Sequence, residues 1–206
     1  MAAQCRLHDF SPQNLDNTAW SFAAAGHWDP ILFDALCREV VMKVDGFQPQ
    51  HLANVMYACA MFGHRDAQLV VTLCTKVMHL RGQLNSQDAC NVAWSLAVLE
   101  GPTGGLKAHQ GLLQGLLMAL SCMWENLQPK GKRQLFQVQL AAQASGVALE
   151  HALSHHMWDD VHRAWEETLM PGRSAPSLLQ RQVYKVVNRV GVKDAKLEHI
   201  MPDGSS

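Results

Sequence analysis

The chain has 206 residues, which predicts one compact domain or one elongated array. Hydrophobic residues make up 48% of it and charged residues 17%, a composition that provides a sizeable core and excludes disorder as the main state. The formal net charge of −1 excludes an overall positive field toward nucleic acid or anionic membranes, so a polyanionic partner needs a local patch.

The first segment, MAAQCRLHDFSPQ, has neither the regions of a signal peptide nor an Arg- and Ser-rich amphipathic leader. The longest uncharged stretch, residues 108–124, is interrupted by polar residues and two glycines, so it predicts a buried helix. Six cysteines without a C-x-x-C pair predict reduced thiols, most of them in the core. We therefore expect no membrane partner.

Three copies of one motif follow at a spacing of 37 residues. The copies are FSPQNLDNTAWSFAAAG from Phe10, FQPQHLANVMYACAMFG from Phe47 and LNSQDACNVAWSLAVLE from Leu84. Four aligned columns match in residue type: Gln13/Gln50/Gln87, Asn17/Asn54/Asn91, Trp20/Tyr57/Trp94 and Ala23/Ala60/Ala97. Self-similarity at a fixed period of this length indicates a repeat architecture.

Each copy predicts a pair of helices. Pro12 and Pro49 suit the first position of a helix, and Gly26 and Gly63 suit the position just after one. A second apolar helix follows each of these two glycines. Because a pair of this size cannot bury its apolar face alone, the sequence predicts an all-α fold, an α-solenoid of stacked helix pairs.

The spacing changes after the third copy. The segment EGPTGGLKAHQ inserts a Gly/Pro loop before a long helix expected over about 106–126. A degenerate fourth copy is predicted over 127–173, with Gln137 aligned 46 residues after Asn91. The predicted organisation is three helix pairs over 1–126, the fourth copy over 127–173, and over 174–206 a basic helix with the start of a truncated C-terminal region.

On a helical wheel the first helices carry a polar stripe opposite their apolar arc. The Gln and Asn columns of this stripe are constant, whereas a third column varies between Asn14, His51 and Asp88. Some helical repeats recognise single-stranded RNA one base per repeat, through two or three side chains, so this pattern predicts base recognition. The candidate RNA-binding residues of the stripe are Gln13, Asn14, Asn17, Gln50, His51, Asn54, Gln87, Asp88 and Asn91.

Two columns have a second interpretation. The aromatic column Trp20/Tyr57/Trp94 could supply stacking faces for bases, but aromatic residues at repeat spacing also suit the core between repeats. The Asn column could recognise bases or could join neighbouring repeats by bonding backbone groups. The sequence alone leaves both alternatives open.

Basic residues gather toward the C-terminal end. Residues 1–126 contain 7 basic and 10 acidic groups, whereas residues 127–206 contain 10 and 8. Cations on one helix face suit a phosphate backbone, although a solvated face explains them as well. The two candidate clusters are Arg181, Lys185 and Arg189, at i, i+4 and i+8, and Lys130, Lys132 and Arg133.

The segment HALSHHMWDDVHRAWEE contains His151, His155, Asp159, His162 and Glu166 on one helix face, a set that zinc sites use. Its opposite face is apolar, so we expect those polar groups to face water and predict no metal site. The chain has no H-E-x-x-H, G-x-S-x-G, Walker or G-x-G-x-x-G motif. We therefore predict neither an enzyme nor a cofactor.

The phrase F-S-P-Q-N-L-D-N-T-A-W-S-F-A-A-A-G and its two echoes resemble the octotricopeptide repeats of algal and protist organelle RNA-binding proteins. QLFQVQLAAQ and S-L-L-Q-R-Q-V-Y-K-V-V-N-R-V-G resemble the segment that leads into the RAP domain of FAST-kinase-like proteins. The resemblance implies RNA binding in a chloroplast or mitochondrion, in transcript maturation, stability, translation or ribosomal RNA processing. We expect any activity of a RAP domain to be missing, because the chain stops where that domain would start.

The sequence therefore predicts binding of single-stranded RNA, with other RNA-processing proteins as further partners. The alternative hypothesis is a protein-binding solenoid scaffold without direct RNA contact, which the net charge of −3 over residues 1–126 favours. The two differ in salt dependence, because binding through phosphates weakens steeply with salt and binding in an apolar groove does not.

Overall fold

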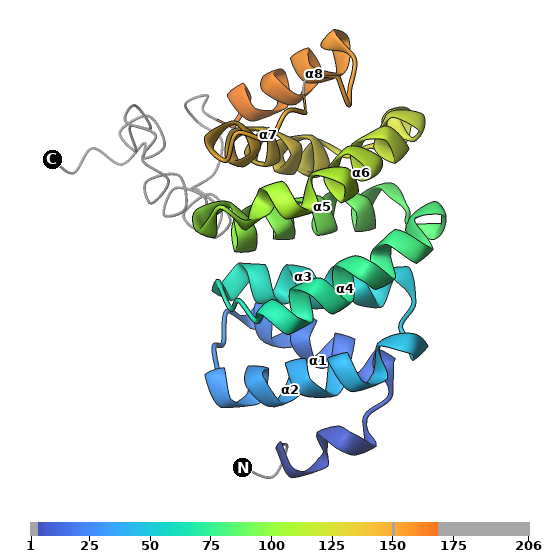
Figure 1. The fold of residues 1–206 in the computed structure, drawn as a ribbon, viewed down its shortest axis with the longest axis vertical. Helices are drawn as coiled ribbons and strands as arrows, with labels where there is room; N and C mark the ends of the chain where they lie inside the picture. The colour runs from blue at the N-terminus through green and yellow to red at the C-terminus, as the bar shows by residue number, and fades with distance from the viewer. Residues whose placement is uncertain (1–3, 150, 169–206) are drawn as a thin grey trace, which may run out of the picture.

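The computed structural model describes residues 4–149 and 151–168, whose helices pair and stack along one long axis (Figure 1). The first helices of the pairs are α1 (Pro12–Ala25), α3 (Pro49–Phe62), α5 (Ser86–Glu100) and α7 (Pro129–Ala144). The second helices are α2 (Pro30–Lys43), α4 (Ala67–Leu80), α6 (Gln110–Cys122) and α8 (His155–Glu166). No strand occurs in these described ranges, and the predicted all-α helical-repeat fold is confirmed.

Local sequence sets where the helices begin and end. Pro12 and Pro49 occupy first positions as predicted, and the carboxylates of Asp29 and Asp66 accept the backbone N–H of the residue three positions on. Gly26 and Gly63 end α1 and α3 with φ of 65° and 66°, a left-handed conformation that costs glycine little. The links 26–29 and 63–66, with sequences GHWD and GHRD, are therefore built alike.

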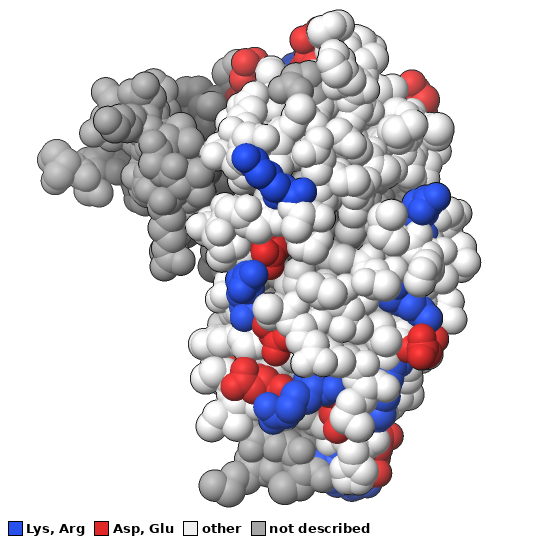
Figure 2. Space-filling view, viewed as in Figure 1, with Lys and Arg blue, Asp and Glu red and all other residues white. Residues whose placement is uncertain are grey.

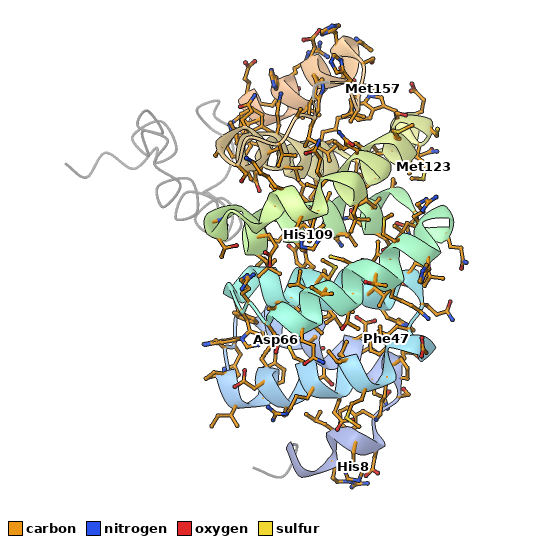
Figure 3. All side chains as sticks on the ribbon, viewed as in Figure 1. His8, Phe47, Asp66, His109, Met123 and Met157 are labelled. Carbon is orange, nitrogen blue, oxygen red and sulfur yellow. The ribbon has the colours of Figure 1, made fainter. Side chains whose placement is uncertain are left out.

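Two layers result from this pairing. In the first-helix layer α1 packs against α3, α3 against α5 and α5 against α7, while α2 packs against α4 in the second-helix layer. In Figure 1 the second helices α2, α4 and α6 lie in front of α1, α3 and α5, and α8 lies at the top end of the stack. Links within pairs and links between pairs lie at opposite edges, marked by Asp66 and Phe47 in Figure 3. The core lies between the layers, where leucines at repeated positions are buried: Leu15, Leu52, Leu32, Leu69, Leu36 and Leu73.

The helix expected over 106–126 is shorter than predicted. Residues Gly105–His109 and Trp124–Asn126 form 3-10 turns on either side of α6. Similar turns, Val44–Gly46 and Arg81–Gln83, follow α2 and α4. A tight turn after the second helix is thus part of the repeat. The apolar pattern of the sequence continues through this turn, so it did not predict where the helix ends.

The fourth pair stacks in a register different from the predicted one. α7 packs on α5 with Asn91 bonded to Gln134 and Trp94 bonded to Gln137, so equivalent positions are 43 residues apart. The alignment of Gln137 with Asn91 at 46 residues is wrong, because the helix start at Pro129 sets the register. The basic helix expected over 174–206 lies outside the described residues.

No helix within residues 4–149 and 151–168 combines the length and the apolar character needed to cross a bilayer.

Candidate nucleic-acid interface

The Gln column lies at the start of the first helices. Gln13 and Gln50 are exposed, and Gln87 is half-buried. The Gln87 amide donates to Asn91 Oδ1 at 2.8 Å, which ties it to its own helix. The first two copies therefore offer free amides in this column, and the third offers one that is already bonded.

The three residues of the variable column, Asn14, His51 and Asp88, differ in burial as well as in type. Asn14 is exposed, whereas His51 is half-buried, with Nδ1 accepting the backbone N–H of Gln48 at 3.2 Å. Burial lowers the pKa of His51 and raises the pKa of Asp88, which is only 5% exposed. The prediction that Asp88 lies on an open stripe is wrong, because α5 is enclosed between α3 and α7.

The Asn column lies between repeats. Asn54 of α3 lies beside the Asp16 carboxylate of α1, whose pKa it lowers, and Asn91 Oδ1 accepts both Gln87 and, at 3.1 Å, Gln134 of α7. Asn17, which has no preceding first helix among the described residues, is exposed. Asn91 therefore joins neighbouring repeats, as one interpretation expected, but through side chains and not through backbone groups. The expectation that Asn91 faces solvent is wrong.

The aromatic column forms a stack through the first-helix layer. The Trp20 and Tyr57 ring centroids are 5.4 Å apart, and those of Tyr57 and Trp94 are 5.2 Å apart. Exposure falls along the stack from 38% at Trp20 through 8% at Tyr57 to 0% at Trp94, whose indole N–H donates to Gln137. Tyr57 and Trp94 belong to the inter-repeat core, and Trp20 is the exposed end of the stack.

The predicted basic cluster on α7 is divided between different environments. Lys132 bonds to Asp160 at 3.1 Å and lies over the ring of Trp124, whereas Lys130 lies 5.3 Å from the Tyr57 ring centroid. Burial, assisted by nearby Arg133, lowers the pKa of Lys130. Lys130 and Arg133 are half-buried, and the second cluster of Arg181, Lys185 and Arg189 lies outside the described residues.

Comparison with known families agrees with a helical-repeat protein of this kind. The family model of the RNA-editing substrate-binding complex 6 protein matches residues 1–111, more than half of the chain. The chain belongs to that family. No curated protein and no solved structure matches it. The broader expectation, an RNA-associated helical family, is supported by this match, whereas the narrower resemblance to octotricopeptide repeats and a RAP domain stays a prediction.

The match to the RNA-editing substrate-binding complex 6 family covers α1 to α5, where the polar columns lie. Within this matched region the polar candidates that retain solvent exposure are Gln13, Asn14, Asn17, Gln50, His51, Asn54 and Gln87. Asp88 and Asn91 are buried. Accessible polar groups therefore concentrate on the first two copies.

The histidine-rich helix α8 uses its polar side chains for packing and solvation. His162 pairs with Gln139 at 2.8 Å and lies edge-on to Phe136, while His155, Asp159 and Glu166 are exposed. His151 is also exposed but lies in the turn before α8, so the prediction that it shares a helix face with the others is wrong. In the part of the chain that the structure describes, no group of three or more His, Cys, Asp or Glu side chains is arranged to hold a metal ion.

Two clusters in this family member were not anticipated from the sequence. The buried Glu100 carboxylate receives Arg65 in a two-point ion pair, with Nε–Oε1 at 2.9 Å and Nη2–Oε2 at 3.1 Å. Cys37 and Cys59 approach within 4.0 Å, beside His64. Arg65 and His64 both belong to the 63–66 link, so only the doubled GHxD phrase could have drawn attention to them.

Asp16 is the third unanticipated group, an aspartate buried on α1. Burial raises its pKa to about 6. Asn54 beside the carboxylate lowers the pKa in part, and the charge of Asp88 raises it by a smaller amount. The folded protein therefore binds this proton more tightly than the unfolded chain does. The contribution of Asp16 to stability is full below the unfolded value of 3.8 and is lost as the pH rises through about 6.

We predict that Asp16→Asn stabilises the protein at neutral pH by about 1–2 kcal/mol, because it removes the buried charge and keeps an acceptor for Asn54. Urea unfolding near pH 4 and near pH 7.5 should give a gain that is clearly larger at the higher pH. Asp159→Asn, at an exposed position on α8, is the control and should change little. An equal gain at both pH values would contradict the raised pKa.

Proposed function

We propose that this chain binds single-stranded RNA through its first helices, within an RNA-processing assembly. The family match carries the proposal, because the matching family is named for a complex that binds RNA-editing substrates. The octotricopeptide-like repeats, and with them a location in a mitochondrion or chloroplast, belong to the same proposal. We further propose that the chain contributes binding and no catalysis.

Accessible amides support base contacts near the N-terminal pairs. Gln13, Asn14, Asn17 and Gln50 are exposed on α1 and α3, and an amide can both donate to and accept from a base edge. The buried Asp88 and Asn91 are excluded from this role. On this proposal only the first two helix pairs recognise bases, and the prediction of one base for every repeat is given up.

Phosphate contacts require cations that are not already neutralised. Lys130 and Arg133 on α7 have no acidic partner among the described ion pairs, in contrast to Lys132, which pairs with Asp160. Arg181, Lys185 and Arg189 remain proposed phosphate contacts from the sequence pattern. Lys130 lies over Tyr57, so α7 extends a positive charge toward the aromatic stack.

Fluorescence anisotropy with a randomised single-stranded RNA pool tests the proposal, with double-stranded DNA as the control ligand. We expect single-strand-selective binding that weakens roughly 20- to 50-fold between about 50 and about 200 mM salt, as three or four phosphate contacts imply. Lys130→Gln/Arg133→Gln should weaken binding and flatten the salt dependence. The matched control Lys76→Gln, whose ammonium already pairs with Asp45 at 3.1 Å, should do neither.

A protein-binding scaffold is the second candidate, and the second-helix layer favours it. Several apolar side chains there are more than half exposed: Ile31, Met42, Val71 and Met118. Figure 2 shows this face with lysines and arginines scattered, several of them beside acidic residues, and with wide uncharged areas. If the chain fails to bind RNA at low salt, the scaffold hypothesis replaces RNA binding.

A further inference from the structure

The aromatic stack of the first-helix layer has one open end. Trp20 packs against Tyr57, Tyr57 against Trp94, and Trp94 is fixed by its hydrogen bond to Gln137. Tyr57 is the one ring that Trp20 contacts within the described part of the chain. The indole is therefore held from one side and remains 38% exposed.

A ring held in this way is suited to stacking. Its orientation is already fixed by Tyr57, so a planar ligand that covers the exposed face orders little additional side chain. Every nucleobase has a π-face, and stacking of a base on an aromatic side chain contributes about 1–3 kcal/mol in single-strand binding. Helical spacing places the indole on the same face of α1 as the exposed side chains of Gln13 and Asn17.

The surroundings distinguish a base from an apolar peptide. Asn17 and Gln13 are exposed on the same helix, three and seven positions before Trp20. An apolar ligand that covered them would leave their donors and acceptors without partners, whereas the edge of a base supplies both. Lys130, over the neighbouring Tyr57 ring, adds a cation suited to an adjacent phosphate.

We infer that Trp20 is the stacking platform for one unpaired base of the bound RNA, with Asn17 and Gln13 beside the base edge. This inference rests on the proposed function. It assigns base stacking to one end of the aromatic column, while Tyr57 and Trp94 support the platform from within the core.

Trp28 provides a matched control for the test. Its side chain is 40% exposed, almost the same as that of Trp20, but it lies in the link between α1 and α2. There it packs against Phe33, Phe62 and His64, away from the aromatic stack. The two variants Trp20→Ala and Trp28→Ala therefore remove the same side chain at similar exposure from different surfaces.

Affinity of the full chain for the single-stranded RNA pool is measured for both variants and for Trp20→Phe, with melting temperatures to verify folding. We expect Trp20→Ala to weaken binding roughly 5- to 150-fold. Trp20→Phe should recover most of the affinity, and Trp28→Ala should bind like the parent chain. Tryptophan fluorescence should be quenched by RNA in the parent and less so in Trp20→Ala.

The outcomes separate the inference from the proposed function. If the parent chain binds RNA and Trp20→Ala binds equally well, the stacking platform is wrong while RNA binding stands. Equal losses in Trp20→Ala and Trp28→Ala also overturn the platform, since the effect then has no specific site. Absence of RNA binding by the parent chain at low salt overturns both.

Discussion

Replacing Trp94 with alanine should destabilise the protein by about 3–5 kcal/mol, the largest effect expected for a single side chain in this fold. Trp94 is completely buried at the centre of the first-helix layer, where it contacts Tyr57 of α3 and bonds to Gln137 of α7. The alanine variant leaves a cavity between three helices. It also leaves the buried Gln137 amide without its partner, which adds a desolvation cost.

Urea unfolding followed by far-UV circular dichroism measures this loss. Trp20→Ala, at the exposed end of the same column, should cost less than about 1 kcal/mol, because half-exposed side chains away from the core contribute little. Trp94→Phe keeps most of the volume and should lose about 1–3 kcal/mol, because the buried Gln137 carbonyl is left without its donor. Similar losses in Trp94→Ala and Trp20→Ala would contradict an aromatic column that joins the repeats.

The sequence predicted most of the architecture, because helix starts, helix ends and the repeat period depend on short local patterns. Pro12 and Pro49 fix helix starts, Gly26 and Gly63 supply left-handed helix ends, and the 37-residue period requires identical pairs to stack. These features depend on only a few neighbouring residues. The fourth pair was predicted in the wrong register, because that register depends on Pro129 and on contacts with α5, which a similarity between glutamine and asparagine does not reveal.

The binding surface was less predictable than the fold. A helical wheel separates polar from apolar residues on one helix, but it does not say where the neighbouring helix lies. Asn17, Asn54 and Asn91 are the same residue in the same repeat position, yet Asn17 is exposed and Asn91 is enclosed by α7. The place of a repeat in the stack decides which amides can reach a ligand, and the sequence of one copy does not reveal that place.

The repeat pattern likewise did not predict the ion pair between Arg65 and Glu100. Arg65 takes the place that Trp28 has in the first copy, and Glu100 lies at the end of α5, 35 residues further along the chain. The inserted loop after α5 lies against Glu100, with Thr103 Oγ1 3.0 Å from its backbone carbonyl oxygen and 3.5 Å from carboxylate Oε2. A Cβ at Gly105 would lie only 2.1 Å from Glu100 Oε2, so the loop needs glycine there.

Replacing Arg65 with methionine should destabilise the protein by about 3 kcal/mol at neutral pH, because it leaves the Glu100 carboxylate buried without a compensating charge. Glu100→Gln should cost less, since the Arg65 side chain is 39% exposed and its freed guanidinium can be solvated. Adding Glu100→Gln to Arg65→Met should recover part of the loss. The asymmetry follows from the different burial of the two partners.

A double-mutant cycle by urea unfolding measures the coupling between Arg65 and Glu100, with Arg38→Met as the control at an exposed arginine on α2. If Arg65→Met costs as much in the Glu100→Gln background as in the parent chain, Arg65 stabilises the link between α3 and α4 by packing alone. A smaller loss in the Glu100→Gln background assigns the stabilisation to the charge pair, which joins the second helix pair to the third at the position where the 37-residue period ends.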